Sequence, residues 1–361
     1  MMIIEACVGN FKAIKSACME FSKGLNVVLG PPSSGKSSIL EAITLIMQSR
    51  GEDALIIEGR LLMIHDIVDV LRNMDTSSKV TVSLKFSIDD QVSSFLKDTG
   101  VNVNSGSITY SYSFIHSLGN VEQEVWLNDN LLVAFGRVND KNLIFKPEPL
   151  DLCITPYHVM HEDALETCSD PPDSVKVAKA VLFSLRQGLR DRFFFIGENR
   201  LAWWKRTFET TVDLLPDYSV GGDAQYTVHQ LSRMLTVPSY REQVKEILSG
   251  MKSLNVEDIT AGFIAPNRLM GFIKAKGSWG VLYNAGLGVR SILPLIVQLV
   301  LAPKGSTIII DGVDIGLNEE SLDNILGVVS NYAETKNLQV IASSRLRPRV
   351  SNARIIELTE A

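Results

Sequence analysis

The sequence is poor in cysteine, in long apolar runs and in excess positive charge. Its four cysteines form no CxxC pair, which argues against a zinc site and a dense disulfide scaffold and favours a cytosolic setting. They are Cys7, Cys18, Cys153 and Cys168. The longest apolar run, residues 291–302, is too short to span a bilayer. The first residues, MMIIEACVGNFK, lack the basic and apolar regions of a signal peptide and are typical of a strand. We therefore expect a cytoplasmic protein without a membrane anchor.

A formal net charge of -6 excludes a basic footprint over the whole molecule, so any contact with DNA requires a local patch. Residues 186–206 mix cations with aromatic residues, a combination that contacts phosphates and stacks on bases in other proteins. The residues concerned are Arg186, Arg190, Arg192, Arg200, Lys205 and Arg206, with Phe193–Phe195 and Trp203–Trp204. A buried strand, FFFI, flanked by ordinary surface charges is the alternative. It is favoured because stacking needs exposed rings, so DNA is a rival partner rather than the expected one.

The 361 residues, of which 45% are hydrophobic, are enough to bury a large core. Residues 1–47 predict strands, a loop and a helix, and residues 79–135 predict the strands of an antiparallel sheet with a turn at Asn128-Asp129. Residues 151–290 predict a mainly helical lobe. The C-terminal part returns to strands, with a helix from Glu319 to about Tyr332 that Asn318 caps. No heptad run or repeat is present, which argues against long coiled-coil arms.

The segment GPPSSGKS, residues 30–37, satisfies G-x-x-x-x-G-K-[ST] between a predicted strand and a predicted helix. In such a loop the backbone N–H groups and the helix N-terminus form an anion site. Lys36 would neutralise the β and γ phosphates, and the Ser37 hydroxyl would complete the shell of a Mg²⁺ ion. We therefore expect ATP and Mg²⁺ to be bound by the loop residues Gly30, Ser33, Ser34, Gly35, Lys36, Ser37 and Ser38.

A phosphate loop needs a second acidic residue at the end of a neighbouring strand to hold Mg²⁺ through its water shell. Asp311, which follows the apolar stretch TIII, is the best candidate. The alternative is a strand-terminal aspartate that starts a turn before Gly312. About 275 residues separate Lys36 from Asp311, which suggests that a sheet and a helical lobe are inserted between the two halves of one site.

Several segments together resemble a known class of proteins. Residues 10–43, NFKAIKSACMEFSKGLNVVLGPPSSGKSSILEAI, look like the N-terminus of ATP-binding cassette (ABC) ATPases of the structural-maintenance-of-chromosomes (SMC) and overcoming-lysogenization-defect type. Residues 284–317 are similar to the signature helix and Walker B strand of that group, and FFFIGENRLAWW and VGGDAQYTVHQL resemble segments of its members without coiled coils. The resemblance implies an α/β P-loop head of the ABC type, with a mixed or parallel core sheet, an antiparallel β subdomain and a helical lobe.

On this basis we expect three parts: an N-terminal lobe over residues 1–150, a mainly helical lobe over 151–290, and a C-terminal lobe over 291–361 that completes the core sheet. The resemblance further implies a homodimer in which two heads sandwich two ATP molecules. Gly286, Gly288 and Ser291 of the signature segment would then contact the nucleotide of the other protomer, with the helix N-terminus aimed at a γ phosphate. A serine is usual where Gly286 stands. A glycine turn before a buried helix is the alternative.

Two positions depart from the pattern of this class. Gly312 stands where a glutamate usually orients or deprotonates the attacking water, and losing a general base costs about 100- to 10,000-fold in rate. Asp314 would substitute if it points inward; a solvent-facing turn aspartate is the alternative. Arg345 stands where a histidine usually contacts the γ phosphate, and it is either a phosphate ligand or a surface cation beside Arg347 and Arg349.

The sequence therefore predicts a protein that binds Mg-ATP, dimerises around it and hydrolyses it slowly. A catalytically silent, nucleotide-dependent interaction module and a DNA-repair or chromosome-associated ATPase are the rival interpretations. The segment HVMHED, with His158, His161 and Glu162, lacks the HExxH order and favours a solvated helix start over a metal site.

Overall fold

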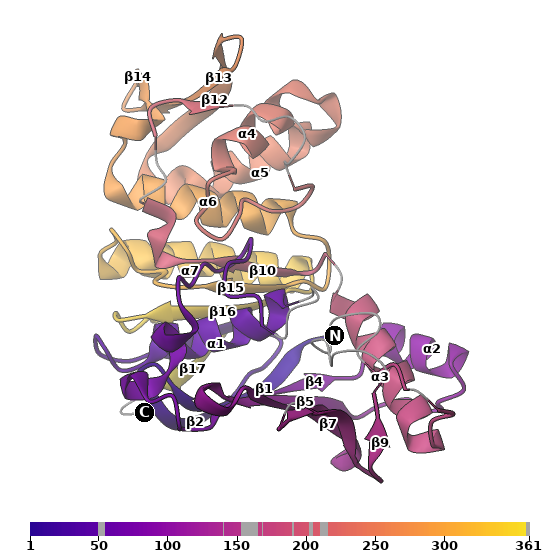
Figure 1. Cartoon of the computed structure of the whole chain (residues 1–361). Helices are drawn as coiled ribbons and strands as arrows, with labels where there is room; N and C mark the ends of the chain where they lie inside the picture. Colours follow the sequence, from indigo (N-terminus) through magenta and orange to yellow (C-terminus); the bar gives the residue numbers. More distant parts are fainter. Residues whose placement is uncertain are drawn as a thin grey trace. The chain divides into compact units, whose positions relative to one another are not determined.

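The computed structural model describes residues 1–49, 55–139, 141–152, 165–167, 169–189, 191–201, 205–209 and 216–358 (Figure 1). The chain forms two compact units. Unit 1 comprises Met1–Ser22, Pro31–Phe193 and Leu358–Ala361, and unit 2 comprises Lys23–Gly30 and Phe194–Glu357. Each unit therefore joins stretches that lie far apart in the sequence. The predicted division into three lobes is a different partition of the chain and stays a prediction.

Unit 1 is built on one sheet with the strand order β2-β1-β4-β5-β6-β7-β8-β9. The strands are β1 (Ile3–Phe11), β2 (Ile14–Glu20), β4 (Val80–Ser87), β5 (Ser107–Ile115), β6 (Asn120–Leu127), β7 (Asn130–Val138), β8 (Lys141–Lys146) and β9 (Leu150–Asp151). The pairs are antiparallel, which confirms the predicted antiparallel sheet. Asn128 and Asp129 both have positive φ, the conformation of a tight two-residue hairpin turn.

The α-helices described in unit 1 are α1 (Lys36–Gln48), α2 (Asp90–Asp98) and α3 (Asp173–Leu189). Helix α1 contacts β1 and β4, and α3 contacts α2, β6 and β7. The apolar positions of α1 recur at helical spacing, and Ile39, Ile43 and Ile46 are all buried. The helix that directly follows the phosphate loop is thus anchored by its apolar residues.

A disulfide joins Cys7 of β1 to Cys18 of β2. The sequence argument against a disulfide scaffold missed this pair. The antiparallel register places the two residues directly opposite each other, although 11 positions separate them in the chain. Cys153 and Cys168 lie outside the described residues.

Unit 2 holds the core sheet, with the strand order β10-β15-β16-β3-β17. Its strands are β3 (Gly24–Leu29), β10 (Phe193–Ile196), β15 (Thr307–Ile310), β16 (Gln339–Ser344) and β17 (Ala353–Glu357). Strands β15, β16, β3 and β17 pair in parallel. The strand before the phosphate loop therefore lies in one sheet with C-terminal strands of the chain, as expected for two halves of an interrupted core.

The α-helices described in unit 2 are α4 (Thr227–Thr236), α5 (Arg241–Met251), α6 (Leu287–Leu301) and α7 (Glu319–Thr335). The Asn318 side chain accepts a hydrogen bond from Ser321 N, so the predicted cap of α7 is confirmed. The apolar run of residues 291–302 is mostly the buried part of α6, which packs against α4, α5 and α7. Among the described residues no helix combines the length and apolar character that a membrane crossing needs.

The middle of the chain is more than a helical lobe. It also forms a small sheet from β11 (Phe208–Glu209), β12 (Val256–Ala265), β13 (Arg268–Ala275) and β14 (Ser278–Val281). Strands β12 and β13 form a long hairpin in which buried and exposed residues only partly alternate. Because a hairpin of mixed burial gives a weak periodic signal, the sequence did not reveal it.

Candidate functional site

The phosphate loop in unit 1 curls around its own lysine. The Lys36 ammonium donates to the carbonyl oxygen of Pro31 at 2.6 Å, and its nitrogen lies 3.5 Å from the Ser34 hydroxyl. Ser33 and Gly35 have positive φ, at 62° and 95°. Left-handed residues in such a loop turn successive N–H groups toward one concave side, where an anion binds. A buried ammonium and inward N–H groups are the donors that a polyphosphate requires.

The loop begins at the carboxyl edge of the core sheet in unit 2. Gly30, the residue after β3, donates from its N–H to the carbonyl oxygen of Ser344 at the end of β16 at 3.4 Å. Strand β15 pairs in parallel with the other side of β16 and ends at Ile310. The starting point of the loop and Asp311 therefore share this edge, with one strand between them.

Asp311 is held by a serine that the sequence did not single out. The Ser343 hydroxyl donates to Asp311 Oδ1 at 2.6 Å and accepts from the Gly312 N–H at 2.7 Å. Asp311 is only 3% exposed. The serine thus fixes both the carboxylate and the backbone of the next residue.

Asp314 and Arg345 pair with each other. Arg345 Nε donates to Asp314 Oδ2 at 3.0 Å, and the Arg345 N–H donates to the same oxygen at 3.3 Å. The Asp314 side chain is buried, whereas the Arg345 side chain is 56% exposed. Asp314 is therefore not the solvent-facing turn aspartate that the sequence left as the alternative. Since it is enclosed by this ion pair, it is also poorly placed to take a proton from water.

These side chains fit a magnesium ion. Asp311 and Asp314 bring two buried carboxylates to the loop that follows β15. Asp314 Oδ1 has no hydrogen-bond partner within the described part of the chain. Carboxylate and hydroxyl oxygens are the hard ligands that Mg²⁺ prefers, and the ion usually keeps several waters. Asp311 is the residue of the core sheet that would hold it.

Arg200 is fully buried and links three segments of unit 2. It lies in the short 3₁₀ helix η4 (Glu198–Leu201), and its donors reach four carbonyl groups and one hydroxyl. The acceptors are the carbonyl oxygens of Gly197, Ser291, Asp311 and Gly312 and the hydroxyl of Ser291. Burial lowers the pKa of Arg200 to about 10, while the charge of Asp311 acts against this shift. The guanidinium is therefore a cation at neutral pH.

The signature segment begins helix α6, with Gly286 at its N-cap. A Cβ on Gly288 would lie 2.9 Å from the carbonyl oxygen of Gly316, so only glycine permits this contact with the loop after β15. Around Gly286 the space is open. Ser291 is 0% exposed and its hydroxyl contacts Arg200, so it supports the segment from within. A direct contact of Ser291 with a nucleotide, which the sequence suggested, does not agree with this burial.

Gly312 and Glu198 are neighbours. A Cβ on Gly312 would lie 3.4 Å from Cγ of Glu198. Burial raises the pKa of the Glu198 carboxyl, and the negative charge of Asp311 adds to the effect, while Arg200 and Arg345 oppose it. Local sequence patterns did not single out this carboxylate, because it follows a strand that only the fold brings beside β15.

The cation-rich segment of residues 186–206 is not an open stacking surface where the structure describes it. Phe193, Phe194 and Phe195 are at most 5% exposed, and Arg200 is buried. Arg192 donates to the side chain of Gln91. Arg190, Trp203 and Trp204 lie outside the described residues, as do His158, His161 and Glu162. The described residues contain no cluster of three or more His, Cys, Asp or Glu side chains that would hold a metal.

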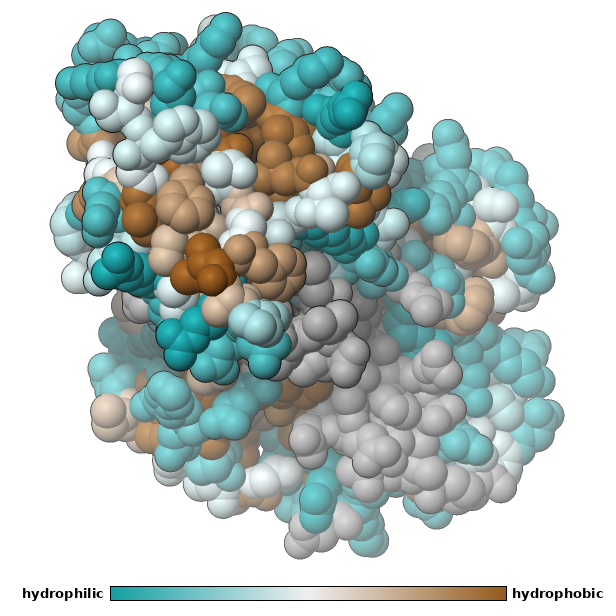
Figure 2. Space-filling model, turned by 90° about the horizontal axis from the view of Figure 1, so that it is seen from above, coloured by the Kyte–Doolittle hydropathy of each residue, from teal (hydrophilic) through white to brown (hydrophobic). Residues whose placement is uncertain are grey.

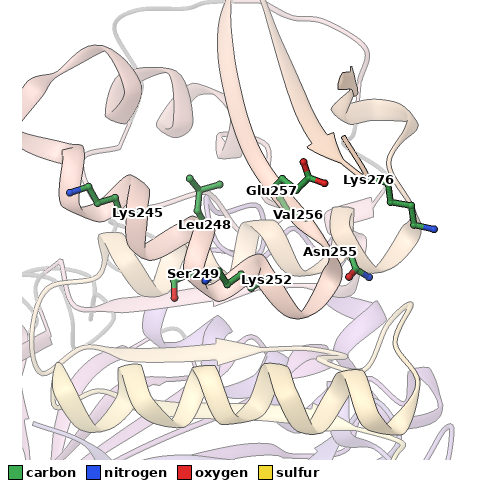
Figure 3. A pocket seen from close by; sticks show the side chains of 8 residues that line it. All are labelled: Lys245, Leu248, Ser249, Lys252, Asn255, Val256, Glu257 and Lys276. Atoms are coloured by element: carbon green, nitrogen blue, oxygen red, sulfur yellow. The ribbon is translucent and has the colours of Figure 1, made fainter. Parts of the chain in front are cut away.

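A pocket of about 610 Å³ lies elsewhere in unit 2, at α5, β12 and the turn between β13 and β14. Three lysines line it, Lys245, Lys252 and Lys276, but Lys245 and Lys276 point outward from its opposite ends (Figure 3). Lys245 is also paired with Glu242 at 2.8 Å. The lysines therefore do not converge on one anion.

Apolar side chains gather on the surface of unit 2 among hydrophilic ones (Figure 2). The large exposed ones on β12, β14, the 3₁₀ helix η8 (Leu282–Asn284) and the start of α6 are Phe263, Ile264, Trp279, Tyr283 and Leu287. Tyr283 and Leu287 flank Gly286 in the chain, with exposures of 44% and 45%. The signature segment is thus bordered by apolar surface.

Comparison with known proteins finds a matching family model and one curated relative. Residues 1–150 match the family described as AAA ATPase domain. A curated relative, the DNA double-strand break repair Rad50 ATPase of Methanopyrus kandleri, is 36% identical over 70 residues, which is 19% of this chain and 8% of the relative. The chain thus matches less than a tenth of that protein's length.

Two solved structures show the same fold over nearly the whole chain. An SMC head bound to the C-terminal winged-helix domain of ScpA has a TM-score of 0.54 and 12% identity, covering 98% of this chain and 94% of that one. An SMC head with an extended coiled coil, bound to the C-terminal domain of ScpA derived from Pyrococcus furiosus, has a TM-score of 0.52 and 13% identity, covering 95% and 89%. The predicted fold class is therefore confirmed.

Proposed function

We propose that this chain, an SMC/Rad50-like P-loop ATPase of the ABC type, binds Mg-ATP, dimerises around it and hydrolyses it slowly. The observation that carries the proposal is the shared edge of the core sheet. The phosphate loop starts there at Gly30, and Asp311 directly follows β15, which lies two places along the same sheet.

Each part of the loop then has a separate task. The N–H groups of residues 33–38 and the α1 N-terminus bind the β and γ phosphates, and Lys36 neutralises their charge. The Ser37 hydroxyl and Asp311 hold the ion, with Ser343 keeping the carboxylate in place. When bound, Mg²⁺ would screen the charge of the phosphates.

Dimerisation is proposed from the surface around the signature segment. Gly286 is uncrowded at the N-terminus of α6, where free N–H groups and the helix dipole attract a γ phosphate. Tyr283 and Leu287 supply exposed apolar area beside it. A second copy that presents its loop-bound ATP to this segment would bury that area and pair the free N–H groups.

Slow hydrolysis follows from the two departures in the site. Gly312 has no side chain to orient water, and Asp314 is enclosed in its ion pair with Arg345. The Arg345 side chain is exposed, but its ion pair with Asp314 competes with any contact to a γ phosphate. We therefore expect ATP binding and dimerisation to be readily measured and the rate of hydrolysis to be low.

Two measurements on the full chain test the proposal. Size-exclusion chromatography with light scattering should show a dimer with ATP-Mg²⁺ and a monomer without it, and a phosphate-release assay should show slow turnover. Lys36→Ala should abolish ATP uptake and the dimer, whereas the exposed Lys23→Ala control should keep both. A wild-type chain that takes up no ATP contradicts the proposal.

DNA stays a rival partner. The Rad50 relative is named for DNA double-strand break repair, which makes DNA a reasonable ligand to test. In the segment from which the sequence predicted DNA contact, the described aromatic residues Phe193–Phe195 are buried, as is Arg200, whereas Lys205 and Arg206 are exposed. Fluorescence anisotropy of labelled DNA, measured at several salt concentrations with and without ATP, tests whether DNA is a partner.

A further inference from the structure

Position 312 disfavours the glutamate that usually follows a Walker B aspartate. Gly312 has a φ of 66°, a left-handed conformation that costs a residue with a side chain about 1–2 kcal/mol. A Cβ there would also lie 2.7 Å from Cδ1 of Ile315. The backbone that holds Asp311 therefore disfavours a side chain at the next position.

The space beside Gly312 is bordered by a carboxylate from another strand. Glu198 begins η4, directly after β10, and its Cγ lies 3.4 Å from the point where a Cβ of residue 312 would be. The end of β10 is fixed next to the end of β15, since the Asp311 N–H donates to the carbonyl oxygen of Ile196 at 2.8 Å. Glu198 thus leaves the sheet at the same edge as Asp311.

The segment that carries Glu198 is anchored on both sides. The Gly197 N–H donates to the carbonyl oxygen of Gly222 at 2.7 Å. Arg200, two residues after Glu198, is held by the backbone of Asp311 and Gly312. Glu198 itself remains among the exposed residues, so water reaches its carboxylate. A general base needs this combination of a fixed backbone and access to water.

We propose that Glu198 is the catalytic carboxylate of this ATPase and takes the part of the glutamate that is missing at position 312. The inference rests on the proposed function, since it requires Mg-ATP at this sheet edge. Glu198 orients a water molecule and accepts its proton while the water oxygen bonds to the γ phosphorus. The bond from that phosphorus to the β,γ-bridging oxygen breaks, and its electron pair remains on ADP.

The test is Glu198→Gln in the full chain, since glutamine keeps the size and removes the proton acceptor. Phosphate release should fall about 100-fold or more, whereas the affinity for ATP should be unchanged. Because bound ATP is no longer consumed, the ATP-dependent dimer should last longer in light scattering. Glu320→Gln, at an exposed position of α7, is the matched control and should behave like wild type.

Glu198→Asp separates a catalytic role from a structural one. Aspartate keeps the carboxylate on a shorter side chain, so it should retain part of the turnover that Glu198→Gln loses. Native turnover in Glu198→Gln overturns the inference, and so does a wild type that binds ATP without measurable turnover. Both outcomes leave the proposed function standing in its binding and dimerisation, whereas failure of the proposed function shows as absent ATP binding in the wild type.

Discussion

Arg200 donates from Nη2 to the Ser291 hydroxyl across 2.8 Å, and so joins the segment after β10 to the first turns of the signature helix. The same guanidinium donates from Nη1 to the carbonyl oxygen of Asp311 at 2.6 Å. A planar group with five donors in fixed directions is suited to such a junction. A second protomer that displaces α6 would therefore also shift the backbone of Asp311, because Arg200 is bonded to both.

Arg200→Lys should destabilise the protein even though the charge is kept. A lysine has three donors on one atom and cannot reach the separate acceptors that Arg200 serves, so buried oxygens lose their partners. We expect the free energy of unfolding to fall by about 3 kcal/mol, since a hydrogen bond to a charged group contributes about 1.5–3 kcal/mol. Urea denaturation measures it. A loss below about 0.5 kcal/mol, typical of surface substitutions, would contradict the junction.

Gly312→Glu should not restore fast hydrolysis, although Gly312 stands where proteins of this class usually have a glutamate. The left-handed φ and the contact with Ile315 Cδ1 oppose any side chain at this position. A glutamate here would also bring a third carboxylate beside those of Glu198 and Asp311. We expect a loss of about 1–3 kcal/mol in stability and no gain in phosphate release. Gly312→Ala is the control, because it should cause a similar strain without the added charge.

Local patterns were enough to predict most of the secondary structure. The alternation in β4, the helical spacing of Ile39 and Ile43 in α1 and the cap at Asn318 each lie within a few consecutive residues. Asp311 could be chosen because a carboxylate at the end of an apolar strand is itself a local signal. Patterns among neighbouring residues were thus enough to predict these helices and strands and to choose Asp311.

The contacts around Asp311 could not be predicted in the same way. Arg200 and Asp311 are 111 positions apart, and Ser343 and Asp311 are 32 positions apart. They meet because β10, β15 and β16 are neighbours in the sheet, an order that no periodicity encodes. Arg200 was assigned to a surface patch for the same reason, since a charged residue is rarely fully buried.

Ser343→Ala should weaken the response to Mg²⁺ more than the binding of ATP itself. The hydroxyl is a donor to Asp311 Oδ1 and an acceptor for the Gly312 N–H, so alanine leaves two buried groups without this partner. We expect a destabilisation of about 1–3 kcal/mol and a higher Mg²⁺ concentration at half-maximal turnover. A titration of phosphate release with Mg²⁺ at saturating ATP measures the second effect. Ser344→Ala is a useful control, since its hydroxyl contacts the carbonyl oxygen of Leu346 instead.

Tyr283→Ala should weaken the ATP-dependent dimer without unfolding the protomer. Its side chain is 44% exposed and stands three residues before Gly286, so a second copy seated on the signature segment would cover it. Aromatic residues at the centre of an interface commonly contribute about 2 kcal/mol or more, which corresponds to at least about a tenfold rise in the dissociation constant of the dimer. Sedimentation with ATP-Mg²⁺ measures this constant.

Phe263→Ala is the matched control for that experiment. Phe263 is also an exposed aromatic residue of unit 2, at 64%, but it lies at the end of the β12–β13 hairpin rather than beside Gly286. If both variants raise the dissociation constant of the dimer equally, the whole apolar surface contributes to the interface and the signature segment is not its centre. If only Tyr283→Ala weakens the dimer, the apolar contact lies beside the bound nucleotide. Tyr283 and the signature residue Gly286, which would cover ATP, are only three positions apart in the chain.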